Sequence, residues 1–143
     1  MIIKILSVQV PQFWEAIKYT IRVAEALPEN QLQPVYIEWL HDLLNDKAQC
    51  FISLSPERRL RGLILSKIVL DKVTGEKYIQ LGSLYAWEQI SNEEYVEACN
   101  IIAKLGRKEG CTHITARSSN PRVSEIASYL GFKEKYKVYD FRL

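Results

Sequence analysis

The first third of the chain carries one strand-like pattern followed by two helical ones. Residues 2–10 are rich in Ile and Val and alternate weakly with polar positions, which predicts a strand. Pro11 suits the first turn of a helix, and apolar residues then recur every three or four positions to about Ala26. Residues 27–30 break this pattern, and a second helix is expected from near Pro34 to Asn45. The apolar faces of the two helices are formed by Trp14, Ile17, Ile21 and Ala24, and by Tyr36, Leu40, Leu43 and Leu44.

Three β segments with short links occupy the middle of the chain. They span residues 50–54, 60–70 and 78–87. The links between them contain turn-forming residues, among them Pro56 and Gly75. Strands joined by hairpin-length links pair with one another in sequence, so these three segments predict an antiparallel meander.

The last third of the chain alternates helices and strands. Ser91 has the side chain of a helix N-cap and Glu94 completes a capping box, so a helix is expected from there to Gly110. Residues 113–116 predict a strand, residues 121–130 a helix closed by Gly131, and residues 133–143 a final strand. The predicted order, β-α-α-β-β-β-α-β-α-β, indicates an α/β fold, a mixed α+β sheet with helices on its faces. No linker divides it, so we expect a single domain over residues 1–143.

Composition excludes several classes of function. The 143 residues suffice for one domain, and 48% hydrophobic with 25% charged residues is typical of a globular chain. The net charge of +2 is too small for strong binding to nucleic acid or to an anionic membrane surface. No segment reaches the ~20 apolar residues of a transmembrane helix, and the N-terminal residues lack the pattern of a signal peptide.

The three cysteines, Cys50, Cys99 and Cys111, form no C-x-x-C pair and leave an odd count. A disulfide framework or a zinc site is therefore not expected. The two histidines have no acidic or cysteine companion at ligand spacing, so we interpret His41 as a surface residue and His113 as a partly buried structural one. Small buried thiols are typical of a reducing compartment, which favours a cytoplasmic protein without a metal.

The C-terminal part of the chain carries a motif with a known counterpart. The residues that fall at the spacings of this motif are Asn120, Val123, Ile126, Leu130, Gly131 and Phe132. Together with residues 108–111 and 61–64, this motif resembles the GNAT superfamily of acyl-CoA N-acyltransferases. The resemblance covers nearly the whole chain in element order and is specific over about residues 104–132. It implies a GNAT-like fold that moves an acetyl group from acetyl-CoA to an amine.

The resemblance also assigns residues to the cofactor. In the family, the end of the third meander strand pairs its backbone with the pantetheine arm, and amides at the start of the next helix hold the diphosphate. Glu88, at the end of that strand, is the candidate general base for the proton of the amine. The implied cofactor-binding residues are Leu84, Tyr85, Ala86 and Trp87 for pantetheine, Ser91 and Asn92 for the phosphates, and Asn120.

The phosphate loop departs from the family's pattern. The family has an Arg or Gln and two Gly or Ala residues there, and this chain has Ile90, Glu93 and Tyr95. Residues 83–105 contain no glycine, so a Cβ stands wherever the backbone would approach a phosphate. Glu93 and Glu94 are expected to satisfy the helix amides themselves and to repel a diphosphate by about 1–3 kcal/mol per charge pair.

These departures leave two functions open. One is an active N-acetyltransferase. The other is a catalytically inactive GNAT-fold module for structure or protein interaction, such as a phage-encoded virion-associated protein. Ala127 favours the second, because many relatives carry at this position a tyrosine that protonates the leaving thiolate. Three or more free amides of residues 88–95 that face a cleft would favour the enzyme, and Glu93 and Glu94 filling that space would favour the module.

The aromatic residues are compatible with both functions, the enzyme and the protein-interaction module. Trp14, Tyr19, Tyr36, Trp39, Tyr85 and Trp87 predict either an aromatic-walled pocket or an exposed hot spot for a protein. The expected partners are accordingly an amine substrate or another protein, with an oligomer left open. The charged turn at residues 57–61 is interpreted as a solvated hairpin end.

Overall fold

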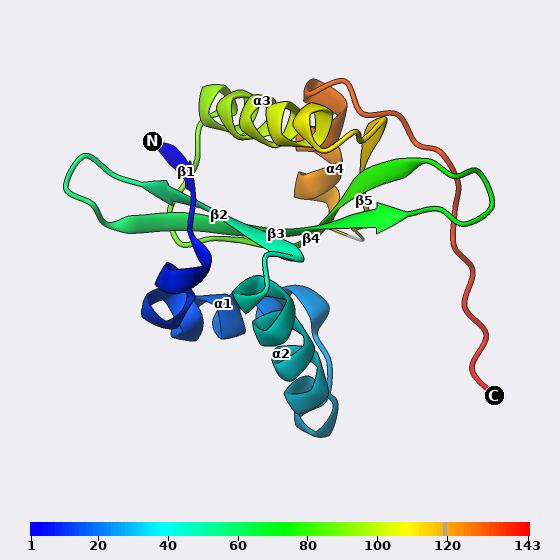
Figure 1. Ribbon diagram of the computed structural model, residues 1–143, viewed down its shortest axis with the longest axis horizontal. Helices are drawn as coiled ribbons and strands as arrows, with labels where there is room; N and C mark the ends of the chain where they lie inside the picture. Colours follow the sequence, from blue (N-terminus) through cyan, green and yellow to red (C-terminus); the bar gives the residue numbers. More distant parts are fainter. Residues whose placement is uncertain (119) are drawn as a thin grey trace.

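Five strands form one mixed sheet at the centre of the molecule (Figure 1). The computed structural model describes residues 1–118 and 120–143. The strands lie side by side in chain order: β1 (Ile2–Lys4), β2 (Ala48–Leu54), β3 (Leu60–Leu70), β4 (Lys77–Ala86) and β5 (His113–Ala116). The β1–β4 pairings are antiparallel, which confirms the predicted meander, and β4 pairs with β5 in parallel.

Helices cover both faces of the sheet. A short 3-10 turn (Ser7–Gln9) leads into α1 (Val10–Glu25), which packs with α2 (Glu29–Leu44) on one face. The helices α3 (Asn92–Lys108) and α4 (Pro121–Tyr129) lie on the opposite face (Figure 1). No helix in the described part of the chain is long and apolar enough to cross a membrane.

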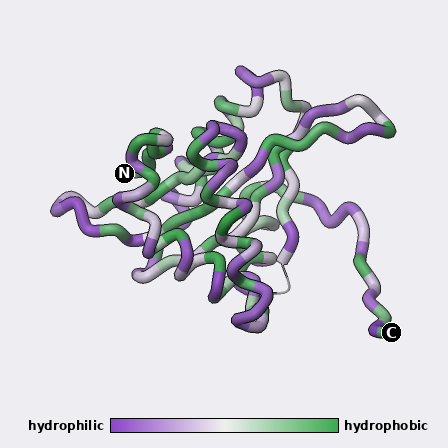
Figure 2. Tube along the Cα trace, turned by 60° about the horizontal axis from the view of Figure 1, so that its bottom comes forward, coloured by the Kyte–Doolittle hydropathy of each residue, from purple (hydrophilic) through white to green (hydrophobic). Residues whose placement is uncertain are grey.

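Alternation along the strands divides the apolar side chains between two cores. Leu63 and Leu65 of β3 are at most 2% exposed and pack under α1 and α2, where Ile17 and Ile21 meet them. Ile64 and Ile68 point to the other face and join the cluster under α3. Figure 2 shows hydrophobic and hydrophilic residues interspersed along the whole trace. Because successive side chains of a strand point to opposite faces, both faces of the sheet are apolar and each is covered by a layer of helices.

The predicted fold class is confirmed, and several predicted boundaries hold. The range of β3 is the predicted one, and α3 begins after Ser91, whose Oγ accepts a hydrogen bond from the Glu94 amide at 3.2 Å. Gly110 and Gly131 have φ values of +79° and +90°, as their roles as helix ends require. The second helix begins earlier than predicted, at Glu29, and accommodates Pro34 inside its first two turns.

Two strand predictions are wrong. The first strand ends at Lys4, because residues 7–9 turn into the 3-10 helix that precedes α1. Residues 133–143 form no strand: they run along the outside of the molecule with every side chain exposed (Figure 1). Alternation alone does not make a strand, since its backbone groups need a neighbouring strand to bond with.

Candidate functional site

The pairing between β4 and β5 ends halfway along β4. It runs from Tyr78 opposite His113 to Leu81 opposite Ala116, whereas β4 continues to Ala86. Within the described residues, the backbone of residues 82–86 is therefore bonded to β3 on one side only. Peptide groups left free on a strand edge can bond to another extended chain. This half of β4 is the first part of the candidate site.

A bulge in β4 marks the point where the two strands part. The register jumps from Leu81 opposite Ser66 to Leu84 opposite Ile64, so β4 holds one residue more than β3 in this interval. Gly82 lies in the bulge against α2, where a Cβ would stand 3.1 Å from the Trp39 ring. Ser83 turns toward α1 and donates a hydrogen bond to Glu25 at 3.0 Å. A bulge bends and twists a strand, which accounts for the divergence of β4 from β5.

Beyond the bulge, the two faces of β4 carry different chemistry. Leu84 stands opposite Ile64, on the α3 side, and Tyr85 stands opposite Leu63, on the α1 side. Tyr85 forms an aromatic cluster with Tyr19 of α1 and with Trp87, the ring centroids lying 5.0–6.0 Å apart. Trp87 is 37% exposed, so the cluster reaches the surface. It builds an aromatic wall beside the free edge of β4.

Residues 87–91 connect this edge directly to the start of α3. Ile90 fixes the connection: it is 8% exposed and packs over Gly62 of β3, where a Cβ would lie only 2.6 Å from Ile90 Cδ1. Within the part of the chain that the structure describes, none of the five amides of residues 89–93 has an intramolecular acceptor. Unpaired amides at a helix N-terminus favour an anion.

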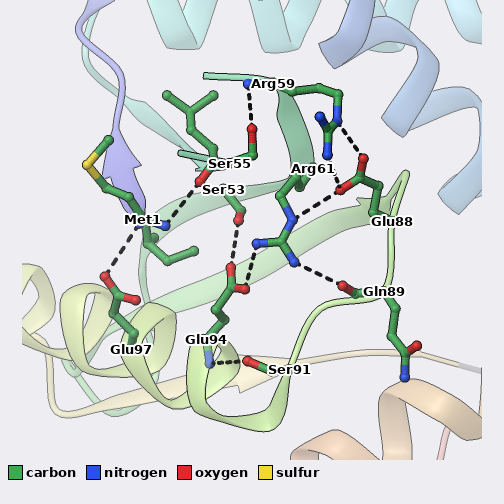
Figure 3. Close-up of polar contacts among 12 residues, drawn as sticks. Met1, Ser53, Ser55, Arg59, Arg61, Glu88, Gln89, Ser91, Glu94 and Glu97 are labelled. Carbon is green, nitrogen blue, oxygen red and sulfur yellow. Dashed lines mark hydrogen bonds and ion pairs between the residues drawn. The ribbon is translucent and has the colours of Figure 1, made fainter. Parts of the chain in front are cut away.

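The expectation that Glu93 and Glu94 satisfy these amides is wrong. Neither carboxylate accepts a backbone amide of residues 88–95 in the described structure. The carboxylate of Glu94 turns toward the sheet, where Ser53 Oγ donates at 2.8 Å and Arg61 Nη1 lies at 2.7 Å (Figure 3). Burial raises the pKa of Glu94, but the bonds from Ser53 and Arg61 outweigh it and leave the pKa below its ordinary value. The charge of Glu94 is therefore compensated.

Arg61 organises the whole connection between β4 and α3. Besides Glu94, it contacts Glu88 at 3.3 Å and donates to the carbonyl oxygen of Gln89 at 3.0 Å (Figure 3). Its side chain is 19% exposed, so the interpretation of residues 57–61 as a solvated turn is wrong at this position. It failed because sequence spacing does not show that β3 brings Arg61 next to a loop almost thirty residues later.

The candidate base Glu88 lies in the same cluster. Its carboxylate accepts hydrogen bonds from Arg59 at 2.6 and 3.2 Å and is also paired with Arg61. The hydrogen bond from Arg59 is the largest influence on Glu88 and holds its pKa below the ordinary value. A carboxylate with a lowered pKa is a weaker proton acceptor. The role of Glu88 as a general base stays a prediction.

Other predicted residues lie away from this cluster. Asn120 caps α4, its Oδ1 accepting a hydrogen bond from the Arg122 amide at 2.9 Å. His41 is exposed on α2, and His113 stacks on Tyr78 with centroids 5.0 Å apart. Among the described residues, no group of three or more His, Cys, Asp or Glu side chains is placed to hold a metal ion.

Comparison with known proteins agrees with this architecture. No protein-family model matches the chain, and no curated protein matches it in sequence. Solved structures do match over nearly the full length. Ribosomal-protein-alanine N-acetyltransferase from Brucella melitensis biovar Abortus 2308 is 13% identical with a TM-score of 0.68, and the match covers 100% of this chain and 99% of that one.

Two further structures contain ligands related to coenzyme A. AAC(6')-Iy, in complex with the bisubstrate analog CoA-S-monomethyl-acetylneamine, is 16% identical with a TM-score of 0.71, over 100% of this chain and 97% of that one. A predicted acetyltransferase from Clostridium acetobutylicum, solved with acetyl-CoA, is 9% identical with a TM-score of 0.74, over 99% and 95% of the two chains. At these identities the likeness establishes the fold. The chain therefore has the fold of the GNAT acetyltransferases, as its motif at residues 120–132 predicted.

Proposed function

We propose that this chain is an N-acetyltransferase that moves an acetyl group from acetyl-CoA to an amine. The observation that carries the proposal is the parting of β4 from β5 after Leu81, which leaves the backbone of residues 82–86 free directly before the unpaired amides at the start of α3. An extended arm that ends in phosphates fits such a site: peptide groups of β4 bond the arm and the helix start holds the anion.

The residues of this chain fit coenzyme A without a glycine-rich loop. Leu84, Ala86 and their neighbours offer backbone groups to pantetheine, and the amides of Ser91 and Asn92 face no competing carboxylate among the hydrogen bonds described. Because Arg61 neutralises Glu94, the repulsion expected from that carboxylate is reduced. Asn120, as the cap of α4, supports the proposal only through the family resemblance.

When bound, acetyl-CoA would supply an activated acyl group, a thioester whose acetyl group can pass to an amine with the thiol as the leaving group; the backbone of residues 84–87 would hold its pantetheine arm and the amides of Ser91 and Asn92 its phosphates. The chain contributes the residues that position the amine and surround it. The wall of Tyr19, Tyr85 and Trp87 stands beside the free edge of β4, and such rings attract a protonated amine before it loses its proton. Glu88 is the proposed proton acceptor, weakened by its two arginines.

Calorimetric titration of acetyl-CoA at moderate salt tests the proposal, with two variants of one residue as matched probes. Asn92 is the first residue of α3 and Ser91 before it is extended, at φ −70° and ψ 158°, so a proline is tolerated at this position. Asn92→Pro removes one amide donor, and Asn92→Ala keeps it. We expect micromolar binding by the parent chain, about tenfold weaker binding by Asn92→Pro, and little change for Asn92→Ala.

The alternative is an inactive module of the same fold. It is the conclusion if millimolar acetyl-CoA gives no heat and no change in thermal stability. The exposed Trp87 edge would then be the first place to look for a protein partner. Equal binding by Asn92→Pro and Asn92→Ala would instead keep the enzyme but remove α3 as the phosphate site.

A further inference from the structure

The C-terminal end of α1 carries two residues that are unfavourable at a helix end. Glu25 is the last residue of α1 and is exposed. The carbonyl groups of a helix give its C-terminal end a partial negative charge, so a carboxylate there is destabilising. The next residue, Ala26, has φ 50° and ψ 38°, in the left-handed region where glycine is favoured. Such departures from local preference are typical of functional positions.

The charge of Glu25 is not compensated by a cation. Among the residues that the structure describes, Glu25 forms no ion pair. Arg22, one turn earlier on α1, places its guanidinium over the ring of Tyr19, 5.3 Å from the centroid. The Glu25 carboxylate instead accepts a hydrogen bond at 3.0 Å from the hydroxyl of Ser83, a residue that is 2% exposed. A carboxylate has two accepting oxygens, so this one neutral donor leaves Glu25 able to bind a cationic ligand.

The bond to Ser83 brings the Glu25 carboxylate to the bulge at which β4 parts from β5. An extended arm that runs from the amides of Ser91 and Asn92 back along the free edge of β4 ends at this bulge. On the same face of the strand, Tyr85 follows Ser83 by two residues and belongs to the aromatic wall. The corner between α1 and β4 therefore combines a negative charge with aromatic rings, beside the place where the arm ends.

We propose that Glu25 binds the acceptor of the proposed acetyl transfer, on which this assignment rests, as an ammonium ion. The acceptors are then aliphatic amines with no carboxylate near the nitrogen, because Glu25 would repel such a group. A carboxylate forms charge-assisted hydrogen bonds with an ammonium group, and the rings of the aromatic wall contact its carbon chain and its charge. Glu88 lies five residues beyond Ser83 and is paired with two arginines. Glu25 is therefore better placed to take the proton that the bound nitrogen gives up.

Binding of 1,5-diaminopentane, measured by calorimetry on the chain alone and on the chain saturated with coenzyme A, is the first test. Glu25→Gln removes the charge and keeps an oxygen that can accept from Ser83, and we expect its dissociation constant to rise tenfold or more. Glu15→Gln is the matched control and should change nothing. Glu15 lies ten positions earlier on α1, about 15 Å along the helix axis, and its side chain is 89% exposed. Equal effects of the two variants, or no binding by the parent chain at tens of millimolar, overturn the assignment.

Thermal stability separates ligand binding from a structural role of Glu25. Because the carboxylate stands at the negative end of α1, Glu25→Gln should leave the melting temperature unchanged or raise it by about 1–2 °C. Loss of stability in this variant would show that Glu25 holds the fold and would overturn its role in binding. Ser83→Ala keeps the charge but removes the bond that orients it, and should weaken diamine binding by about threefold.

Acetyl transfer, followed by mass spectrometry of the products, tests the substrate class. With acetyl-CoA present, we expect propylamine and 1,5-diaminopentane to react at least tenfold faster than glycine, whose carboxylate would face Glu25. Glu25→Gln should lower kcat/KM for the two amines by tenfold or more. A preference for glycine overturns the assignment. If acetyl-CoA does not bind but the diamine still binds in a way that depends on Glu25, the proposed function falls and the ammonium site stands.

Discussion

Arg61 Nη1 lies 2.7 Å from Glu94 Oε1, so a cation at the start of β3 holds the first turn of α3 against the sheet. Both side chains are less than a fifth exposed, at 19% and 18%. Ser53 takes the second carboxylate oxygen, and no buried side-chain nitrogen or oxygen in the described part of the chain lacks a partner. Of the two glutamates that were expected to block the phosphate site, Glu94 is thus a structural residue.

Removing this cation should destabilise the fold. Arg61→Met leaves the Glu94 carboxylate partly buried without its charged donor, which we expect to lower the free energy of unfolding by about 2 kcal/mol. Urea denaturation measures the change. The control is Arg122→Met, because the Arg122–Glu125 pair is 56% and 70% exposed and should contribute less than about 0.5 kcal/mol. Equal effects of the two variants would contradict the importance of the Arg61 pair.

The ion pair between Arg61 and Glu94 sets part of the pH dependence of the free energy of unfolding. The pKa of Glu94 is lower in the folded chain than its ordinary value of 4.5, so its contribution is complete above that pH and is lost as the pH falls through the folded pKa. We expect the parent chain to lose stability between pH 5 and pH 3. Glu94→Gln should be less stable at pH 7, and its difference from the parent should shrink on acidification. A constant difference across this range would rule the pair out as the cause.

Glu88→Gln separates ion pairing from base catalysis. Because Arg59 and Arg61 lower the pKa of Glu88, we expect this variant to retain kcat within about tenfold, whereas loss of an effective general base costs about 10²–10⁴-fold. Arg59→Met supplies a second readout. It should raise the pKa of Glu88, and if Glu88 accepts the proton, the acidic limb of kcat/KM moves to higher pH.

The three thiols should differ in reactivity. Burial raises the pKa of Cys50 to about 12, and the residue is 1% exposed. Cys99 and Cys111 are only partly buried, although burial raises the pKa of both. At pH 8 we expect iodoacetamide to modify Cys99 and Cys111 first and Cys50 only after urea unfolding, as measured by mass spectrometry. Labelling of Cys50 in the native chain at a comparable rate would contradict the buried position of β2.

Two leucines of β3 offer a matched test of the core. Leu65→Ala empties a site that is fully buried under α1 and α2, and should cost about 3 kcal/mol of stability. Leu70→Ala at the end of the same strand removes the same atoms from a side chain that is 57% exposed, and should cost less than about 1 kcal/mol. Similar losses in urea denaturation would show that Leu65 is not the core residue described.

Local patterns predicted most of the fold because they were also the physical causes of it. The period of apolar residues placed β3 and α1, and the Ser91 cap and Gly110 bounded α3 closely. The motif ending at Phe132 led to the correct fold family although no sequence relative matches. Residues 133–143 failed the same reasoning, because their pattern is that of a strand but their own chain brings no partner to them.

The site was less predictable, since its defining contacts join distant parts of the chain. Arg61 and Glu94 are 33 positions apart, and only the packing of α3 on the sheet brings them together. The charged residues of the hairpin around Arg61 suggested that Arg61 is exposed to solvent. The two glutamates at the start of α3 suggested that the site for an anion is blocked. The sequence did place a cation, Arg61, at the start of β3 and an anion, Glu94, at the start of α3, and this was the available signal for an ion pair. The sequence does not give the distance between the two side chains.

The bulge at Gly82–Ser83 has a consequence for how this molecule can diversify. It fixes which face the later side chains of β4 occupy: Tyr85 meets Tyr19 of α1, as does Trp87 just after the strand, while Leu84 stands on the α3 side. Substitutions in the aromatic wall therefore leave the opposite face of the strand unaltered. Selection, or a designed library, can reshape one side of β4 while the other is inherited intact.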